Sequence, residues 1–437
     1  MYHIWAVWSN ERGFGLSSME LFRVLSSEMT EPVRDPLWGS ILLSPALERL
    51  ASSPPFAKLG RIKQLGPAYL VYPGATHTRR AHSLGVFHMA RRMASALASR
   101  GELEFCSIEG LRSYLVAALC HDLGHFPYAH SLKELPLAEH EALAARELRE
   151  KPLNRLVQET GADPEAVAAI IDTKADSGGN REIAFFRGLL SGVLDPDKLD
   201  YLNRDAFFCG VPYGLQDSEF VLRRLAVGPG DRLAIEERGL MSVEGLLFSK
   251  YLMYRSVYWH RGVRSATAMI KKAVLIALER GSLKSEALYG LDDEGFYATL
   301  RGLPSECLGL ARDVFEGRTF SCVLDLPFDE SKESHRSILD LEARMRIEDD
   351  LARGFGLGPA DLAVDIPEGV SFETDLLVLR DASTARGDTR PALPFAESPT
   401  VFSPPVVQGF ARSLRRLRLF AREGSERLGK TALELFR

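Results

Sequence analysis

The sequence predicts a mainly α-helical protein with a smaller α+β region at its C-terminal end. The stretches 82–100, 107–125 and 243–280 carry apolar residues at the three- and four-residue spacing of a helix that is buried on one face. Beyond about residue 285 the apolar runs become short and are typical of strands. These runs are 362–367, 375–380 and 414–422.

We divide the chain of 437 residues into three parts, a length that suits one large domain with additions or two to three domains. Residues 1–30 form an N-terminal extension, because a structured pattern begins only near Asp35 and Met29 is an alternative start. Residues 31–285 form the main helical domain. Residues 286–437 form the α+β region.

Local capping signals predict where several helices begin. Ser44 and Asp195 are each followed by proline, and Ser107 precedes an apolar helical run. Serine and aspartate are favoured N-caps, and proline fits the first turn of a helix. We therefore expect helices to start directly after Ser44 and Ser107, and a local helix start or a kink at Asp195.

Two further predictions concern local geometry. Residues 233–245 predict a short hairpin with its turn at Gly239. If the helix that follows residue 107 continues far enough, His121 and His125 lie four residues apart on one of its faces.

The composition excludes several classes of protein. The net charge of −5 gives no overall signature of nucleic-acid binding. The five cysteines are scattered without a CxxC motif, which predicts free thiols in a reducing compartment. No apolar run reaches about 18 residues and the start lacks a signal-peptide pattern, so we expect no membrane span and a cytoplasmic protein.

Histidines cluster in one part of the chain, where seven of the ten lie between His77 and His140. His82, His121 and Asp122, together with an aspartate of the string LDPDKLDY, offer the imidazole and carboxylate ligands of a catalytic divalent metal. Charged residues within apolar helices are costly unless they are paired or bind a metal. A single histidine taken alone is more often an ordinary core or surface residue, so it is the cluster that favours a metal site.

Seven strings of this chain match the motifs of one enzyme family. They are DPLWG (35–39), RIKQLG (61–66), YPGATHTRRAHSLGV (72–86), HDLGHFPYAH (121–130), HE (140–141), DPDKLDYLNRDAFFCGVPYG (195–214) and YRSVYWH (254–260). In these strings and their order the chain resembles the HD-domain phosphohydrolases, and in particular the branch that contains the deoxynucleoside triphosphate triphosphohydrolases. The resemblance implies an HD-type helical fold for residues 31–285.

The resemblance also implies the identity of the metal ligands. They correspond to His82, His121, Asp122 and Asp197 in this sequence. The ion implied is divalent, either Mn, Fe or Mg, with Zn, Co and Ni as alternatives.

A second cluster resembles the catalytic residues of the family, and comprises His125, His130, His140 and Glu141. His130 would protonate the leaving oxygen or otherwise assist attack, and Glu141 would orient it. Some members of the family carry an acid three residues after the histidine that corresponds to His130. At that position this chain carries Lys133. The departure bears on proton transfer and leaves the metal site untouched.

Other positions resemble substrate contacts of the family. Two basic residues would bind phosphates, a Gln-Leu pair and an aspartate would contact the sugar, a tyrosine would exclude a 2′-hydroxyl, and a Tyr and a His would line the base end. Each has a structural alternative: the tyrosines as helix core, the lysine as a partner of nearby aspartates, the Gln-Leu pair as a turn, and Arg80 in place of its neighbour. The phosphate contacts are Arg79 and Lys198, and the sugar contacts are Gln64, Leu65 and Asp205. Tyr201 would exclude the 2′-hydroxyl, and Tyr258 and His260 would line the base end.

We therefore expect a metal-dependent dNTP triphosphohydrolase that attacks the α-phosphorus and releases deoxynucleoside and triphosphate. The alternatives are a phosphatase, phosphodiesterase or single-strand nuclease of the same superfamily, or a non-catalytic nucleotide-sensing protein. The resemblance also implies a homo-oligomer. An arginine-rich run at 412–422 leaves nucleic acid as an alternative partner, although a solvated face explains such a run better.

Overall fold

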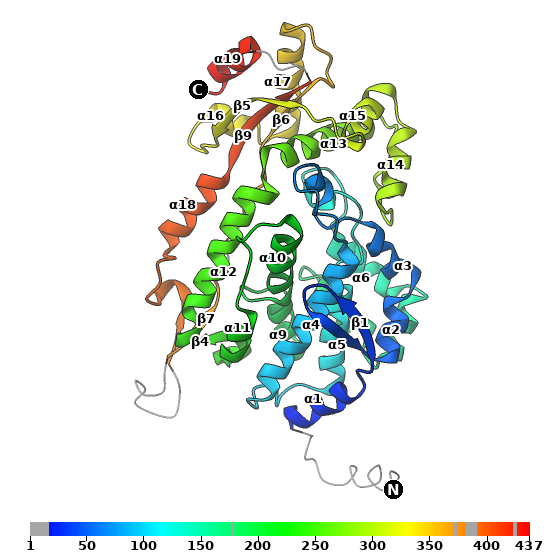
Figure 1. Ribbon diagram of the computed structural model, residues 1–437, viewed down its shortest axis with the longest axis vertical. Coiled ribbons are helices and arrows are strands. Elements are labelled where there is room, and N and C mark those ends of the chain that lie inside the picture. The colour runs from blue at the N-terminus through cyan, green and yellow to red at the C-terminus, as the bar shows by residue number, and fades with distance from the viewer. Residues whose placement is uncertain (1–16, 177, 371, 373, 381–390, 423–425) are drawn as a thin grey trace.

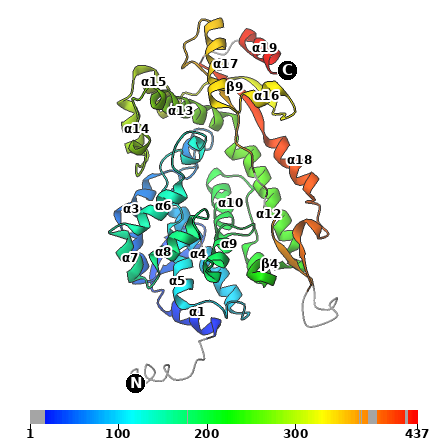
Figure 2. The ribbon, with the colours of Figure 1, turned by 180° about the vertical axis from the view of Figure 1, so that it is seen from behind.

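The computed structural model describes residues 17–437, except 177, 371, 373, 381–390 and 423–425. Helices make up most of this part of the chain, and the strands form only small sheets, which confirms the predicted class. A bundle of helices forms the body of the molecule, α12 and α18 run beside it, and a cap of helices and strands closes one end (Figures 1 and 2).

The helices up to residue 253 build the body and its flank. They are α1 Ser18–Ser27, α2 Pro45–Ala51, α3 Pro54–Lys58, α4 Arg79–Ala98, α5 Ile108–Cys120, α6 His140–Arg149, α7 Leu153–Glu159, α8 Pro164–Ile171, α9 Arg181–Leu190, α10 Pro196–Cys209, α11 Ser218–Arg224 and α12 Leu240–Met253.

Most of the later helices belong to the cap. They are α13 Arg261–Glu279, α14 Asp293–Arg301, α15 Ser305–Phe315, α16 Glu333–Ser337, α17 Leu341–Gly354, α18 Pro404–Leu414 and α19 Glu426–Leu435.

The three predicted helix starts are confirmed. The side chain of Ser44 accepts a hydrogen bond from the backbone of Leu47, and Ser107 caps α5 in the same way. Asp195 caps α10 by accepting from the backbone N–H of Lys198 at 2.6 Å. Each cap satisfies a backbone donor that the helix itself leaves unpaired.

The predicted hairpin at 233–245 is wrong. β4 (Arg232–Glu236) pairs with the upstream strand β3 (Leu225–Gly228), and α12 begins at Leu240 after a single turn through Gly239. The apolar residues beyond Gly239 are therefore buried as the face of a helix rather than as a returning strand.

Three sheets are present in the described residues. β1 (Glu31–Asp35) and β2 (Gly39–Leu43) form a hairpin in the body. β7 (Leu377–Leu379) and β8 (Ala392–Pro394) extend the pair β3–β4 into a four-stranded sheet, which joins the predicted main domain to the predicted C-terminal region. The cap contains the third sheet, ordered β5 (Ser321–Pro327), β9 (Arg416–Ala421) and β6 (Leu362–Asp365).

Helix α4 is the centre of the body. It packs against α5 and α10 and also against α1, which lies within the predicted extension. Val86, Phe87 and Met93 of α4 are fully buried in the largest apolar core. Because these neighbours hold α4 on several sides, polar residues near its N-terminal end occupy fixed positions.

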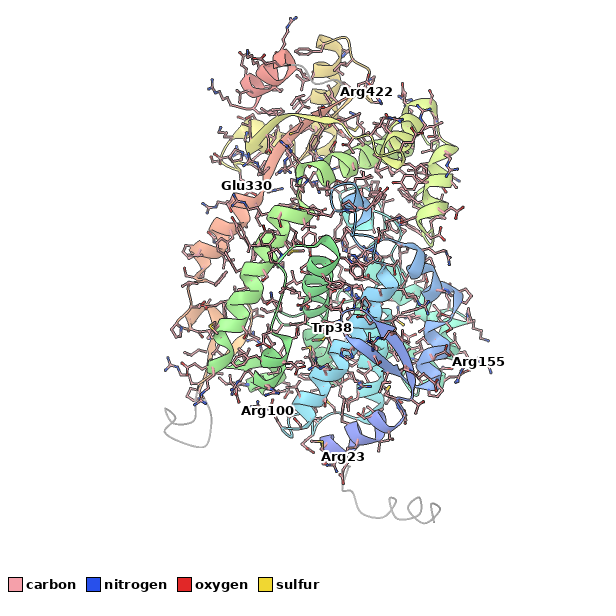
Figure 3. The ribbon with its side chains drawn as sticks, viewed as in Figure 1. Arg23, Trp38, Arg100, Arg155, Glu330 and Arg422 are labelled. Carbon is pink, nitrogen blue, oxygen red and sulfur yellow. The ribbon has the colours of Figure 1, made fainter. Side chains whose placement is uncertain are left out.

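Four of the five arginines of the run 412–422 contact carboxylates, and the fifth, Arg412, donates to Gln408. Arg415 pairs with Glu330, Arg416 and Arg418 both contact Asp325, and Arg422 pairs with Asp313 and Asp361. Figure 3 shows Arg422 within the cap. These pairs neutralise the basic charge of β9 and its ends, which weakens the nucleic-acid alternative.

Two predictions from composition can be compared with the described residues. All five cysteines are free thiols. No helix in the described part of the chain has both the length and the apolar character needed to cross a bilayer.

Gly124 allows a close approach that a side chain would block. A Cβ added there would lie 2.1 Å from the backbone oxygen of His140 and 2.5 Å from the backbone nitrogen of Ala144. We expect Gly124→Ala to lower the free energy of unfolding by about 1–3 kcal/mol, because the turn and α6 must move apart. Urea-induced unfolding followed by circular dichroism measures the change.

Gly188 provides the matched control. It lies in α9 with open space where its Cβ would be, so Gly188→Ala should stabilise the protein by about 0.5–1 kcal/mol. An equal change in the free energy of unfolding in the two variants would contradict the packing described for Gly124.

Candidate metal centre and active site

The candidate metal ligands come from three helices of the body. His82 lies in the first turn of α4, whose N-cap is Thr78. His121 directly follows the last residue of α5, and Asp122 continues into a turn in which the backbone N–H of His125 donates to the Asp122 carbonyl at 2.9 Å. The helix therefore ends too early for His121 and His125 to share one of its faces.

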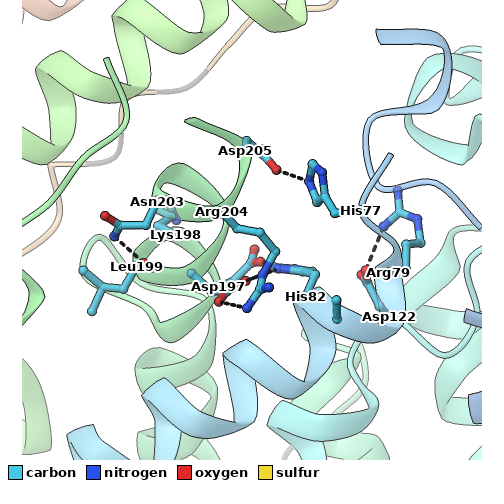
Figure 4. A network of polar contacts seen from close by, with 12 residues as sticks. His77, Arg79, His82, Asp122, Asp197, Lys198, Leu199, Asn203, Arg204 and Asp205 are labelled. Atoms are coloured by element: carbon cyan, nitrogen blue, oxygen red, sulfur yellow. Dashed lines mark hydrogen bonds and ion pairs between the residues drawn. The ribbon is translucent and has the colours of Figure 1, made fainter. Parts of the chain in front are cut away.

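The structure brings the four predicted ligands together, and Figure 4 shows three of them, His82, Asp122 and Asp197. His82 Nε2 lies 2.9 Å from Asp197 Oδ1, and His121 Nε2 lies 3.4 Å from Asp122 Oδ1 and 3.8 Å from Asp197 Oδ1. The ligand atoms of His82, His121 and Asp122 all lie within 4.8 Å of one another. Two imidazoles and two carboxylates at this separation could hold one divalent metal ion.

The protonation of His121 suits a metal ligand. Its Nδ1–H donates to the Ala118 carbonyl at 3.0 Å, which leaves the lone pair on Nε2. This Nε2 is buried and has no hydrogen-bond partner. A buried, unpaired nitrogen directed at two carboxylates is costly unless a cation completes the site.

The charges around His82 also favour a cation. Burial opposes the charged form of this imidazole, but hydrogen bonds to Asp197 and Asp200 raise the pKa of His82 to about 10. The carboxylates of this site therefore stabilise positive charge placed between them.

The predicted catalytic histidines form a second cluster next to the first. The rings of His125 and His140 stack at 3.8 Å, and the His130 ring lies 4.8 Å from His125 and 5.0 Å from His140. Desolvation within the cavity, with the Arg79 charge as a second cause, lowers the pKa of His130 to about 4, although solvent still reaches this residue. Glu141 lies against His140, with 3.1 Å between its Oε2 and Nδ1 of that ring, rather than against His130.

Both sites open into one cavity of about 750 Å³. Its walls come from the body, from α12 and α13, and from the segment after β6. His125 and His260 do not line it: His125 is fully buried, and His260 caps α13 by accepting from the backbone of Gly262. The predicted residues that line it are Gln64, Leu65, Arg79, His82, His121, Asp122, His130, His140, Glu141, Asp197, Lys198, Tyr201, Asp205 and Tyr258.

The two predicted phosphate contacts have carboxylate partners. Arg79 Nη1 donates to Asp122 Oδ2 at 2.7 Å, and Lys198 Nζ donates to Asp195 Oδ2 at 2.6 Å. The pairing of Lys198 matches the structural alternative considered for it. Both cations nevertheless line the cavity and remain available to a ligand that competes for their donors.

The residues expected at the sugar and base are joined by hydrogen bonds. Asp205 accepts from Tyr258 OH at 2.7 Å and lies 2.8 Å from His77 Nε2, and the ring of Tyr201 packs edge-on against Tyr258. No local pattern in the sequence pointed to His77, because its partner lies 128 positions away in the chain. Oε1 of Gln64 is buried without a partner, which leaves an acceptor for a ligand hydroxyl.

The segment between His125 and His140 is anchored to later parts of the chain. Arg344 donates to both carboxylate oxygens of Glu134, at 2.9 and 3.1 Å, and Lys271 also pairs with this carboxylate. Tyr128 OH contacts Tyr297 OH at 2.6 Å. These contacts engage the carboxylate of Glu134 and hold the segment carrying His130 in place.

Comparison with known proteins identifies two regions of this chain. A sequence profile of the HD domain matches residues 79–197, and a profile described as the HD associated region matches residues 217–386. The first match contains all four candidate metal ligands. The chain therefore contains an HD domain followed by an HD associated region.

Relatives of this HD-domain chain include proteins with and without an assigned activity. It is 36% identical over 246 residues to the uncharacterised protein YwfO of Bacillus subtilis, covering 56% of this chain and 52% of the relative. It is 27% identical over 298 residues to the human deoxynucleoside triphosphate triphosphohydrolase SAMHD1, covering 61% of this chain and 48% of the relative. The chain thus spans about half the length of the curated relatives it matches.

Solved structures share the fold across nearly the whole chain. A phosphohydrolase from Bacteroides thetaiotaomicron superposes with a TM-score of 0.70 at 22% identity, covering 90% of this chain and 100% of the other. A hypothetical protein from Aquifex aeolicus gives 0.68 at 24% identity, with coverage of 94% and 100%. At these identities the likeness shows a shared fold.

The anchor at Glu134 can be tested by hydrogen exchange. In Arg344→Met the carboxylate of Glu134 keeps only Lys271, so we expect a local loss of about 1.5–3 kcal/mol, or at least about tenfold faster amide exchange over residues 130–138. Exchange in α5 should not change. The measurement is hydrogen–deuterium exchange followed by mass spectrometry.

Arg353→Met serves as the control, since Arg353 pairs with Asp350 and both side chains are more than two-thirds exposed. It should exchange like the wild type. Unchanged exchange over 130–138 in Arg344→Met would show that this arginine does not hold the segment.

Proposed function

We propose that this chain is a metal-dependent nucleotide phosphohydrolase that converts a dNTP into deoxynucleoside and triphosphate. The observation that carries the proposal is the convergence of two imidazoles and two carboxylates on the wall of a large cavity. Basic side chains line the same cavity, as do His130 and His140 of the histidine cluster. Together they provide what the cleavage of a polyphosphate ester requires.

In this proposal His82, His121, Asp122 and Asp197 hold the metal. The donor set of nitrogen and oxygen suits Mn, Fe or Mg, with Zn, Co and Ni as alternatives. A divalent ion at this position supplies Lewis-acid chemistry, activating water and polarising a phosphoryl oxygen.

The protein side chains act on the phosphates and the leaving group. Water adds to the α-phosphorus, the bond from that phosphorus to the 5′-oxygen breaks, and the 5′-oxygen takes up a proton. Arg79 and Lys198 would neutralise charge on the phosphates. His130 would assist the leaving oxygen, and its surroundings are shaped by His125, His140 and Glu141.

The nucleoside would occupy the part of the cavity lined by Gln64, Leu65, Tyr201, Asp205 and Tyr258. Hydrogen-bonding groups here suit the sugar hydroxyl, and the Tyr201 ring would leave no room for a 2′-hydroxyl. Support comes from the relatives named as deoxynucleoside triphosphate triphosphohydrolases. His260 does not line the cavity and would act on the base end only through the start of α13.

We further propose a homo-oligomer, as the resemblance implies, and a cytoplasmic location, as the composition suggests. A phosphatase, a phosphodiesterase, a nuclease and a nucleotide sensor are the competing functions, and the product formed distinguishes among them.

The product assay is the test of the proposed activity. Purified protein with Mn²⁺, Mg²⁺, Fe²⁺ or Co²⁺ should release deoxynucleoside and intact triphosphate from at least one dNTP, supplied singly or in mixtures. Ion-exchange chromatography separates these products. His121→Ala should lose at least about 10²-fold in kcat while keeping its circular dichroism spectrum, because it removes one ligand without breaking a buried ion pair.

Mono- or diphosphate products would assign a different phosphohydrolase, and degradation of single-stranded DNA alone would assign a nuclease. Nucleotide binding without turnover under every metal would assign a sensor.

The role of Tyr201 predicts a change in sugar selectivity. In Tyr201→Ala the space beside the sugar opens, so kcat/KM for the ribonucleotide should rise relative to the matching deoxynucleotide by about 10-fold or more. Tyr254→Phe, at another tyrosine lining the cavity, should leave this ratio unchanged. An unchanged ratio in Tyr201→Ala would remove the ring from the selectivity of the site.

A further inference from the structure

The turn of the β1–β2 hairpin reaches into the body beside the candidate metal site. Asp35 accepts from the backbone N–H groups of Leu37 and Trp38 at 2.9 and 2.8 Å, which fixes the turn. Its second oxygen accepts from Arg204 Nη1 at 2.8 Å. Trp38 is carried by this turn toward the middle of the helical body (Figure 3). The string DPLWG thus meets α10, although nothing in the proposed reaction uses it.

Asp200 is the point where this turn, α10 and α4 meet. Its Oδ1 accepts from Trp38 Nε1 at 2.5 Å and from Arg204 Nη2 at 2.9 Å. Its Oδ2 lies 2.8 Å from Arg204 Nε and 2.9 Å from His82 Nδ1. Both Asp200 and Arg204 are completely buried, and every oxygen of the carboxylate has two partners.

The space around this carboxylate is closely filled. A Cβ added to Gly85 of α4 would lie 1.9 Å from Asp200 Oδ1 and 2.4 Å from Arg204 Nη2. The glycine lets α4 approach α10 until His82 and Asp200 are in hydrogen-bond contact. The position of the carboxylate is therefore set from three directions.

This contact determines what His82 can do. A carboxylate only accepts hydrogen bonds, so Nδ1 of His82 carries the proton and donates it to Asp200. The ring is then held with Nε2 directed at Asp197 and the candidate metal site. A metal-binding histidine is commonly oriented through its other nitrogen in this way.

We propose that Asp200, held by Arg204 and Trp38, positions His82 as a metal ligand, and that the DPLWG turn belongs to the metal centre for this reason. The inference rests on the metal site of the proposed function. Asp200, Arg204, Trp38 and Asp35 are positioning residues that touch neither substrate nor metal.

A purely structural role for the same carboxylate is the alternative, and the chain offers a matched control for it. Asp205 also lies on α10, is also buried, and also contacts a buried histidine, His77, at 2.8 Å. His77 is not among the candidate ligands. Loss of either carboxylate should destabilise the fold, but only loss of Asp200 should change the affinity for metal.

The test is a titration of metal-free protein with MnCl₂ alone, followed by isothermal calorimetry. We expect Asp200→Asn to bind Mn²⁺ about 10- to 100-fold more weakly than the wild type. Asp205→Asn should bind it as tightly as the wild type, even if both variants melt earlier. With Co²⁺ in place of Mn²⁺, the visible absorption of the bound ion should change in Asp200→Asn and not in Asp205→Asn. Only the first substitution changes how a metal ligand, His82, is held.

Trp38→Phe covers the case in which Asp200→Asn does not fold. It removes one donor to Asp200 and keeps the ion pair with Arg204, so we expect a smaller loss of affinity in the same direction. Wild-type affinity in Trp38→Phe, and in Asp200→Asn where it folds, would overturn the inference.

The same series separates this inference from the proposed function. If His82→Ala binds Mn²⁺ as tightly as the wild type, or the wild type binds none, the metal site itself fails. If metal binding follows the expected order but no dNTP is cleaved, the proposed activity fails and the role of Asp200 stands.

Discussion

Buried carboxylates between α4, α5 and α10 are the constraint on which the rest of the helical body depends. Asp122, Asp195, Asp200 and Asp205 are each at most 5% exposed, and an unpaired charge at that depth is strongly destabilising. Each therefore has its own donor, and the donors are Arg79, Lys198, Arg204 with His82, and His77 with Tyr258, respectively. Asp197 differs because its side chain is 37% exposed and faces the cavity. The pairing fixes the positions of these side chains. It leaves ligand atoms directed at the place where a cation fits.

The sequence could predict those parts of the site that local chemistry determines. A serine or aspartate before a helical run is a cap wherever it occurs, so the starts of α2, α5 and α10 were predictable. The clustering of His82, His121 and Asp122 was also visible as an excess of ligand residues in one stretch. His77 and Trp38 were not predictable in this way, because their partners lie 128 and 162 positions away and only packing brings them together.

Two errors have the same origin. The residues after Gly239 have enough apolar character for either a strand or a helix. They form a helix because β3 and β7 already pair with both edges of β4. The expected common face of His121 and His125 failed because α5 ends at Cys120, where Gly124 lets the chain turn tightly against α6. Tertiary contacts settled both cases, and neither contact can be inferred from the residues involved alone.

The candidate active site extends beyond the residues that the HD profile matches. The cavity is lined by residues of α12 and α13 and by the segment at 366–370, all outside residues 79–197. The segment with His130 is also held by Arg344 and Tyr297 from the later part of the chain. The geometry of the histidine cluster therefore depends on the region matched by the HD associated profile, and the two parts form one site.

The charges of this cavity bear on the kind of anion it suits. Acidic side chains, among them Asp122, Asp195 and Glu134, line it alongside the basic ones and engage several of them in ion pairs. The arginines of β9 are likewise paired with carboxylates. Nucleic-acid binding draws on a continuous excess of positive charge, which such pairing removes. A small polyanion needs only the few donors that converge beside the metal ligands, so the charge balance favours a nucleotide over a nucleic-acid strand.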